Sequence, residues 1–141
     1  MSAADSPARG KTVPHINHIA IKVASIAESS VLYEDVFGFK HVSTVHSPGR
    51  TSHHLSDGGF FITLIQYDSE DSPEADFAGP GGCIHHFGIV VEEPEKYEKA
   101  LRDHGCEILS GSASKLPVKF RPSPGVVAEL LVEDSIKPDS K

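Results

Sequence analysis

The sequence predicts an α+β domain built from two similar modules, each with the order strand, helix, strand, strand, strand. Three observations lead to this prediction. Alternating apolar and polar residues indicate strands, and apolar residues at helical spacing follow the first strand of each half. Marker residues also recur at nearly constant offsets, as expected for duplicated units. These offsets are 68, 67 and 66 positions for the pairs His18 and His86, Gly38 and Gly105, and Gly59 and Gly125.

The first module is expected to span 15–67. Alternation over 18–23 predicts its first strand. Ser25 with Glu28 three residues later is typical of a capping box, so a helix should begin there and end at Gly38. Three further strands are predicted over 39–46, 51–56 and 60–67.

The second module should span 83–133, after a linker at 68–82 without apolar periodicity. A second helix should begin at Pro94 and end at Gly105. The strand candidates of this half are 86–91, 106–109, 117–121 and 126–132. Together the modules predict one domain over 15–134, with flexible tails at 1–14 and 135–141.

Composition narrows the classes of function. A length of 141 residues suits one domain, and a net charge of -7 argues against nucleic acid or an anionic membrane as partner. The longest apolar run, Phe60–Ile65, is too short to span a bilayer, and the first residues lack the apolar segment of a secretory signal. Cys83 and Cys106 are too few for a disulfide framework. We therefore expect a cytoplasmic protein that binds a small molecule.

Alternation along three strands predicts a metal site. If Ile19 and Ile21 face the covering helix, His18 turns to the opposite face, and the same reasoning applies to His86. Each histidine is followed two positions later by a small residue, which leaves room for an ion. On the last strand Glu129 lies between apolar neighbours, where a carboxylate is costly unless it is paired or binds a cation. Two imidazoles and one carboxylate suit catalytic zinc or non-haem iron.

A structural interpretation competes with this one. A strand histidine is commonly a satisfied core residue, and Glu129 could pair with an arginine such as Arg121. The duplication favours the metal, because equivalent positions of two modules meet near their pseudo-twofold axis.

Four segments of the sequence, NHIAIKV, SVLYEDVFGF, HHFGIVV and AELLVE, resemble the vicinal oxygen chelate superfamily. This superfamily includes glyoxalase I, methylmalonyl-CoA epimerase, bleomycin and fosfomycin resistance proteins and extradiol dioxygenases. The resemblance covers 15–133 and implies that the eight strands of two βαβββ modules curl around a metal-containing cleft. It also implies that His18, His86 and Glu129 bind one divalent ion, which could be Zn, Ni, Co, Mn or Fe(II).

The fourth ligand position of the family falls on Thr63, whose neutral hydroxyl is a poor metal ligand. The site would then have three protein ligands and water, unless another register brings Gln66 to it. This departure weakens the analogy with isomerases and favours oxygen chemistry. The surroundings of Glu129, however, lack the Tyr and Pro pattern that extradiol dioxygenases carry.

The residues around the metal suggest candidates for proton transfer and substrate binding. His54 or His46 could line the cleft as a general acid or base, and Glu129 could act if it can leave the metal. A mostly apolar wall favours a substrate with a hydrophobic body and an oxygen-bearing head. The predicted wall residues are Phe61, Thr63, Ile65, Val127 and Leu131.

We therefore expect a metal-dependent lyase or isomerase of the glyoxalase type, in which the metal stabilises an enolate-type intermediate on a carbonyl or hydroxyl substrate. An Fe(II) extradiol-type dioxygenase is one alternative. A binding or resistance protein without chemistry is another. Homodimers are common among similar proteins, so a pair of identical chains is a candidate assembly.

Overall fold

The structure, a computed structural model, describes residues 14–113, 117–132 and 136 of the chain. Its first half contains β1 (His15–Lys22), α1 (Ile26–Val31), a π-helical turn η2 (Leu32–Val36), β2 (Lys40–Ser47), β3 (Arg50–Ser56) and β4 (Phe61–Tyr67). Its second half contains β5 (Cys83–Val90), α2 (Pro94–Asp103), β6 (Glu107–Ser110), β7 (Val118–Arg121) and β8 (Ala128–Leu131). Apart from residues 14 and 136, the predicted tails lie outside the described residues.

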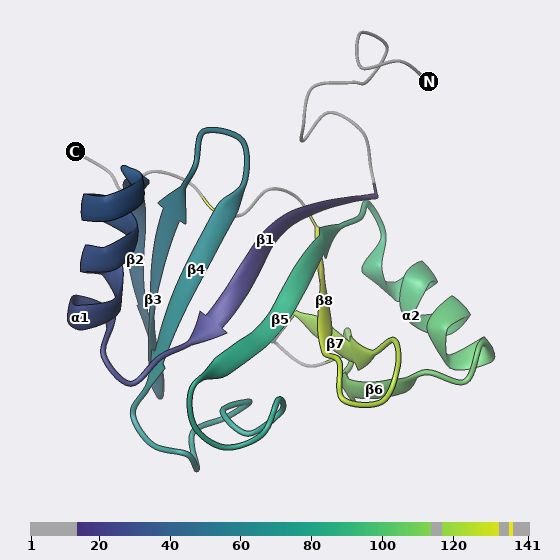
Figure 1. Cartoon of the computed structure of the whole chain (residues 1–141). Helices are drawn as coiled ribbons and strands as arrows, with labels where there is room; N and C mark the ends of the chain where they lie inside the picture. The colour runs from purple at the N-terminus through teal and green to yellow at the C-terminus, as the bar shows by residue number, and fades with distance from the viewer. Residues whose placement is uncertain (1–13, 114–116, 133–135, 137–141) are drawn as a thin grey trace, which may run out of the picture.

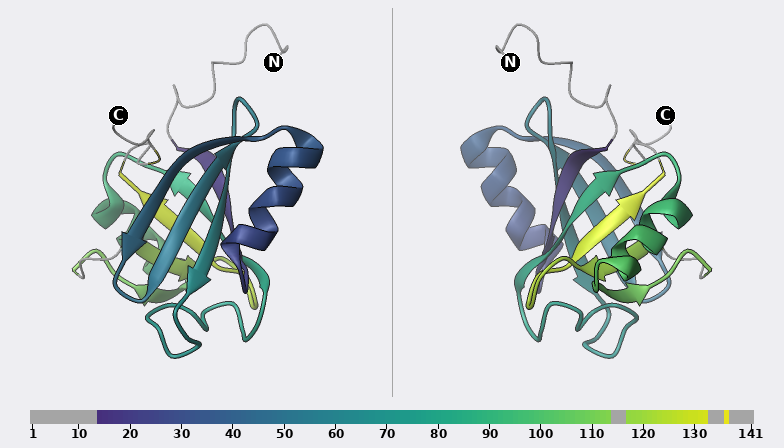
Figure 2. Two further views of the ribbon diagram at one scale, coloured as in Figure 1. Left: turned by 90° about the vertical axis from the view of Figure 1, so that its left-hand side faces the viewer. Right: turned by 90° about the vertical axis from the view of Figure 1, so that its right-hand side faces the viewer.

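The described strands form an eight-stranded sheet in the order β2-β3-β4-β1-β5-β8-β7-β6. The two halves meet where β1 pairs antiparallel with β5. On each side of this junction the first strand of a half pairs parallel with its last strand, β1 with β4 and β5 with β8. Figure 1 shows α1 and α2 beside opposite halves of the sheet, and Figure 2 shows its curvature. The predicted α+β fold of two βαβββ units is confirmed.

The helices begin where the sequence predicts. The Ser25 side chain accepts a hydrogen bond from the backbone N–H of Glu28 and so caps α1, while Pro94 opens α2. Gly38 and Gly105 follow the two helical segments with φ of 72° and 83°, a conformation that glycine adopts without strain. One detail differs from the prediction, because the first helix changes after Val31 into the π-helical turn η2.

The second half has a well-defined apolar core between α2 and the sheet. Ala128 and Leu130 of β8 are buried in it, and Tyr97 and Leu101 of α2 pack against it. This arrangement turns the alternate residue, Glu129, to the inner face of the sheet. The alternation predicted for this strand is therefore observed.

The connection between β4 and β5 is more than a linker. Lys22 of β1 is buried and donates to the backbone carbonyls of Ala75 and Gly79, and it also pairs with Glu70 at 2.9 Å. These contacts hold the connection against one end of the sheet. The connection also carries Glu74, whose side chain is buried and whose φ is 70°. Hydrogen bonds and ion pairs help to attach this segment to the domain, and neither requires apolar periodicity.

None of the helices in the described part of the chain has the length and apolar character needed to cross a membrane. Cys83 and Cys106 are both free, and each is partly exposed rather than fully buried.

Candidate metal centre

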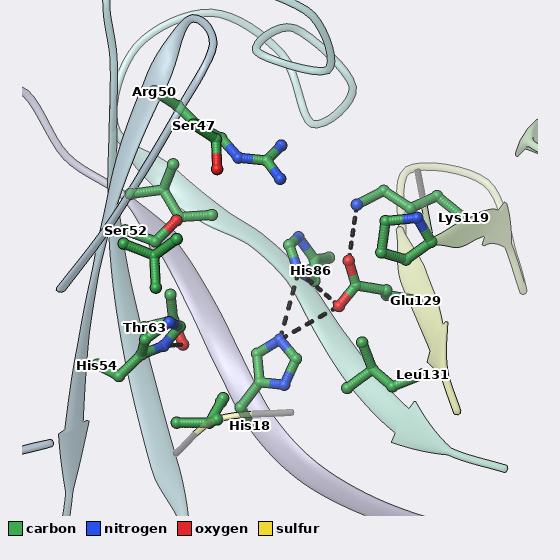
Figure 3. A pocket seen from close by; sticks show the side chains of 14 residues that line it. His18, Ser47, Arg50, Ser52, His54, Thr63, His86, Lys119, Glu129 and Leu131 are labelled. Carbon is green, nitrogen blue, oxygen red and sulfur yellow. Dashed lines mark hydrogen bonds and ion pairs between the residues drawn. The ribbon is translucent and has the colours of Figure 1, made fainter. Parts of the chain in front are cut away.

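Three polar side chains meet on the inner face of the sheet near its centre. His18 lies on β1, His86 on the adjacent β5, and Glu129 on β8, and all three are buried. The Nε2 atoms of the two imidazoles are 3.4 Å apart. The Oε1 atom of Glu129 lies 3.5 Å from Nε2 of His18 and 3.6 Å from Nε2 of His86 (Figure 3). The fold thus brings together the three residues predicted as ligands.

The small residues beside the histidines make room across the strand pair. In the register of β1 and β5, His18 lies opposite Gly88 and His86 lies opposite Ala20. A Cβ atom at Gly88 would lie 2.2 Å from Cε1 of the His18 ring, closer than any real contact. Each small residue therefore accommodates the imidazole of the other module, and Gly88 is required where it stands.

Asn17 sets the tautomer of His18. The Nδ1 atom of His18 lies 2.6 Å from the side-chain oxygen of Asn17, which can only accept, so Nδ1 carries the proton. Burial lowers the pKa of His18 from 6.5 to about 4, so the ring is neutral near pH 7. Its Nε2 atom therefore presents a lone pair to the site.

A relay of hydrogen bonds from the Glu74 backbone through His85 sets the tautomer of His86. The Nε2 atom of His85 donates to the backbone carbonyl of Glu74 at 2.7 Å. Burial lowers the pKa of His85 to about 4, so this ring is neutral and its Nδ1 atom is an acceptor. The Nδ1 atom of His86, 2.8 Å away, must then donate to it. The lone pair of His86 is left on Nε2, facing Glu129.

The three facing atoms form a donor set that fits a divalent ion. Two lone pairs and a carboxylate oxygen meet with no proton between them, an arrangement that a cation stabilises. The three separations of 3.4, 3.5 and 3.6 Å place a point about 2.0 Å from all three atoms, which matches zinc–nitrogen and zinc–oxygen bond lengths. Imidazole ligands whose second nitrogen is hydrogen-bonded are typical of metal sites.

Lys119 of β7 is the partner of Glu129, rather than the arginine considered from the sequence. Its ammonium lies 2.7 Å from Oε2 of Glu129 and 2.8 Å from Oε1 of Glu74. Arg121 instead donates to the backbone carbonyl of Phe77 and pairs with Glu107. Burial alone would raise the pKa of Glu129, but the charge of Lys119, 2.7 Å from Oε2, helps to hold the pKa well below 4.5. Glu129 is therefore ionised, with Oε1 left for an ion.

The fourth family position carries no strong donor. Thr63 on β4 is paired with Ala20 just as Glu129 is paired with Gly88, so the two positions are equivalent in the two modules. The Thr63 hydroxyl lies 2.8 Å from Nδ1 of His54 on the neighbouring β3. Gln66 is exposed and accepts from the backbone N–H of Ile26, so no other register brings it to the site.

A cleft of about 230 Å³ opens beside the three ligands. Three of the predicted wall residues, Thr63, Ile65 and Leu131, line it. Phe61 and Val127 are not among the described residues that line this cleft, and their contact with substrate stays a prediction. Both lie two positions before Thr63 or Glu129 in the sequence. The full lining comprises His18, Val45, Ser47, Arg50, Ser52, His54, Thr63, Ile65, His86, Pro117, Lys119, Glu129, Leu131 and Ile136.

The two candidate proton carriers from β2 and β3 are separated by the structure. His54 lines the cleft, whereas His46 is exposed and contacts the Thr51 hydroxyl.

Sequence reasoning missed several polar partners. Lys119 stands between apolar Val118 and Phe120 on a predicted strand, so its inward position was detectable from alternation. Nothing in the sequence indicates the position of Glu74, because it belongs to an irregular segment. His85 precedes a predicted ligand directly, and its role becomes visible only from its contact with the Glu74 backbone.

Comparison with known families identifies the class of this protein. The model of the Glyoxalase/Bleomycin resistance protein/Dioxygenase superfamily matches residues 15–114. The chain belongs to this superfamily, as the resemblance of its motifs predicted.

Solved structures show the same fold. A hypothetical protein from Bacillus halodurans C-125 is similar with a TM-score of 0.72 and 25% identity, over 84% of this chain and 94% of that chain. A methylmalonyl-CoA epimerase in complex with methylmalonyl-CoA and NH4+ is similar with a TM-score of 0.70 and 23% identity, over 91% of this chain and 100% of that chain. The methylmalonyl-CoA epimerase from Mycobacterium tuberculosis has a TM-score of 0.68 and 22% identity, over 92% of this chain and 93% of that chain. No curated protein matches the chain in sequence.

Proposed function

We propose that this protein is a metal-dependent enzyme that moves a proton on, or rearranges a bond in, a small carbonyl or hydroxyl compound, as an isomerase or lyase does. The observation that carries this proposal is the meeting of three unprotonated donor atoms from His18, His86 and Glu129 beside an open cleft. A divalent ion held there would supply Lewis-acid stabilisation of negative charge developing on a substrate oxygen.

The residues of the chain divide the remaining work. Lys119 holds the second oxygen of Glu129, so this carboxylate keeps one orientation. Because the pKa of Glu129 is well below 4.5, its carboxylate is a weak base. His54 faces the cleft and is oriented by the Thr63 hydroxyl, so we assign proton transfer to His54.

The similar structures support this proposal at the level of the fold. Two of them are methylmalonyl-CoA epimerases, which are isomerases. The superfamily also contains dioxygenases, as its description states.

A second candidate is an Fe(II) dioxygenase of the extradiol type. It is favoured by one observation, the Thr63 hydroxyl in the place of a fourth ligand, which leaves two histidines and one carboxylate. This ligand set with open positions is typical of non-haem iron oxygenases.

One experiment compares the two candidates. Protein purified without oxygen is analysed for metal and incubated in D2O with a panel of α-substituted carbonyl acids and thioesters, and separately with catechols. The proposal predicts exchange of the α-proton in NMR spectra, lost in the His54→Gln variant while the metal content persists. Bound iron with oxygen uptake on catechols would establish the dioxygenase instead. Metal and tight ligand binding without turnover would indicate a binding protein.

A further inference from the structure

The cleft contains a cation that the metal centre does not use. Arg50 opens β3 and lines the cleft, and its side chain is 22% exposed. Figure 3 shows its guanidinium group extending from the strands of the first half into the cleft, with Ser47 beside it. Ser47 is the cross-strand partner of Arg50, and Ser52 lines the same wall. One arginine and two hydroxyls therefore surround one end of the cleft.

The donors of Arg50 are only partly occupied within the protein. Its Nη1 atom lies 3.2 Å from Oε1 of Glu74, an oxygen that also accepts from Lys119 at 2.8 Å. Arg50 also hydrogen-bonds Tyr67. A guanidinium has five N–H donors, so the contacts with Glu74 and Tyr67 leave others for a ligand.

The charge of the cleft also favours an anionic ligand. The charged side chains that join Arg50 to the metal centre are two cations and two carboxylates: Arg50, Lys119, Glu74 and Glu129. The charges of these four side chains cancel. A divalent ion would therefore leave the cleft with an excess of about two positive charges, which attracts anions.

We propose that Arg50, assisted by Ser47 and Ser52, binds a carboxylate of the substrate at the end of the cleft away from the metal. This inference rests on the proposed function, and it narrows the substrate class to small acids. Such a substrate carries oxygens that bind the metal at one end and a carboxylate at the other. A volume of about 230 Å³ limits the enclosed part to roughly ten non-hydrogen atoms, below the usual size of ligand pockets.

Hydroxamic acids test the inference with defined probes. Acetohydroxamic acid chelates zinc through two oxygens. Its analogues with a terminal carboxylate on two, three or four methylene groups add only the second charge. Calorimetric titration of the zinc-loaded protein should show that one of these lengths binds at least about tenfold more tightly than acetohydroxamic acid.

Variants assign the gain to Arg50. In Arg50→Gln the tenfold gain should disappear while zinc and acetohydroxamic acid bind as before. In Arg50→Lys, which keeps the charge and loses the bidentate fork, a smaller gain should remain. The matched control is Arg102→Gln, which removes an exposed guanidinium of α2 that pairs only with Glu98 among the contacts observed, and it should keep the full gain.

The outcomes distinguish a failure of carboxylate binding by Arg50 from a failure of the proposed function. Zinc and acetohydroxamic acid binding without any gain from the carboxylate, or a gain that persists in Arg50→Gln, would overturn this inference and leave the proposed function intact. A protein that binds neither zinc nor acetohydroxamic acid would overturn both.

Discussion

Replacing Gly88 by alanine should disrupt the metal centre and preserve the fold. The added Cβ would lie 2.2 Å from Cε1 and 2.5 Å from Nδ1 of His18. Non-bonded carbon atoms settle at about 3.5 Å or more, so the imidazole must move by at least about 1 Å. Gly88 is not among the residues with positive φ, so its backbone accepts an alanine.

The size of the effect follows from this displacement. Metal–ligand distances tolerate deviations of about 0.2 Å, so a shift of about 1 Å removes His18 from the coordination sphere. We expect the dissociation constant for zinc to rise at least about 100-fold, the upper end of what losing a supporting hydrogen bond costs. Overpacking should lower the unfolding free energy of the metal-free protein by about 1–3 kcal/mol.

Competition with a chromophoric zinc chelator measures the dissociation constant, and urea denaturation measures stability. Gly82→Ala is the matched control, because its Cβ would meet only the Lys22 carbonyl at 3.3 Å. On a His18→Ala background, the Gly88→Ala change should cause no further loss of affinity. A folded Gly88→Ala protein with wild-type zinc affinity would refute the assignment of His18 as a ligand.

Three further predictions concern the buried polar network. Below pH 6.5 the unfolded chain protonates His18 and His85, whereas the folded, metal-free chain keeps them neutral until about pH 4. The unfolding free energy should therefore decrease as pH falls from 6.5 to 4, by up to about 3 kcal/mol for each ring. Urea denaturation of the His85→Gln variant at several pH values should show a shallower decrease than the wild type. An equal pH dependence in the two proteins would contradict the burial of a neutral His85. Lys119→Met leaves Glu74 and Glu129 without their shared cation, so urea denaturation should show a loss of about 3–5 kcal/mol, and a loss under 1 kcal/mol would be inconsistent with the network. The His85→Leu variant should bind zinc about 10–100-fold more weakly. The His85→Gln variant keeps an acceptor for His86 and should bind zinc nearly normally. Equal zinc affinity of the two variants would exclude the relay through His85.

Much of the fold was predictable because the signals were local. Alternation defined the strands, Ser25 and Pro94 defined the helix starts, and the duplication indicated how the halves meet. The three facing donors followed from the same reasoning, since strand alternation decides which face a side chain occupies. Duplication then placed His18 and His86 on neighbouring strands.

The lining of the cleft and the position of Glu74 depend on contacts that no local pattern encodes. Alternation gives Phe61 and Val127 the same face as Thr63 and Glu129, but it does not tell which of these residues line the cleft, and only Thr63 and Glu129 do so among the described residues. Glu74 reaches Lys119 from an irregular segment, where neither period nor turn chemistry specifies a side-chain direction.

Titration of metal-free protein with Co²⁺, followed by visible absorption, tests the central claim most directly. Co²⁺ accepts the same nitrogen and oxygen ligands as zinc, and its absorption bands report their number. We predict saturation at one ion per chain, with the bands lost in His18→Ala, His86→Ala and Glu129→Ala. Unsaturable binding, or saturation that persists when these three residues are replaced, would contradict the assignment of the site.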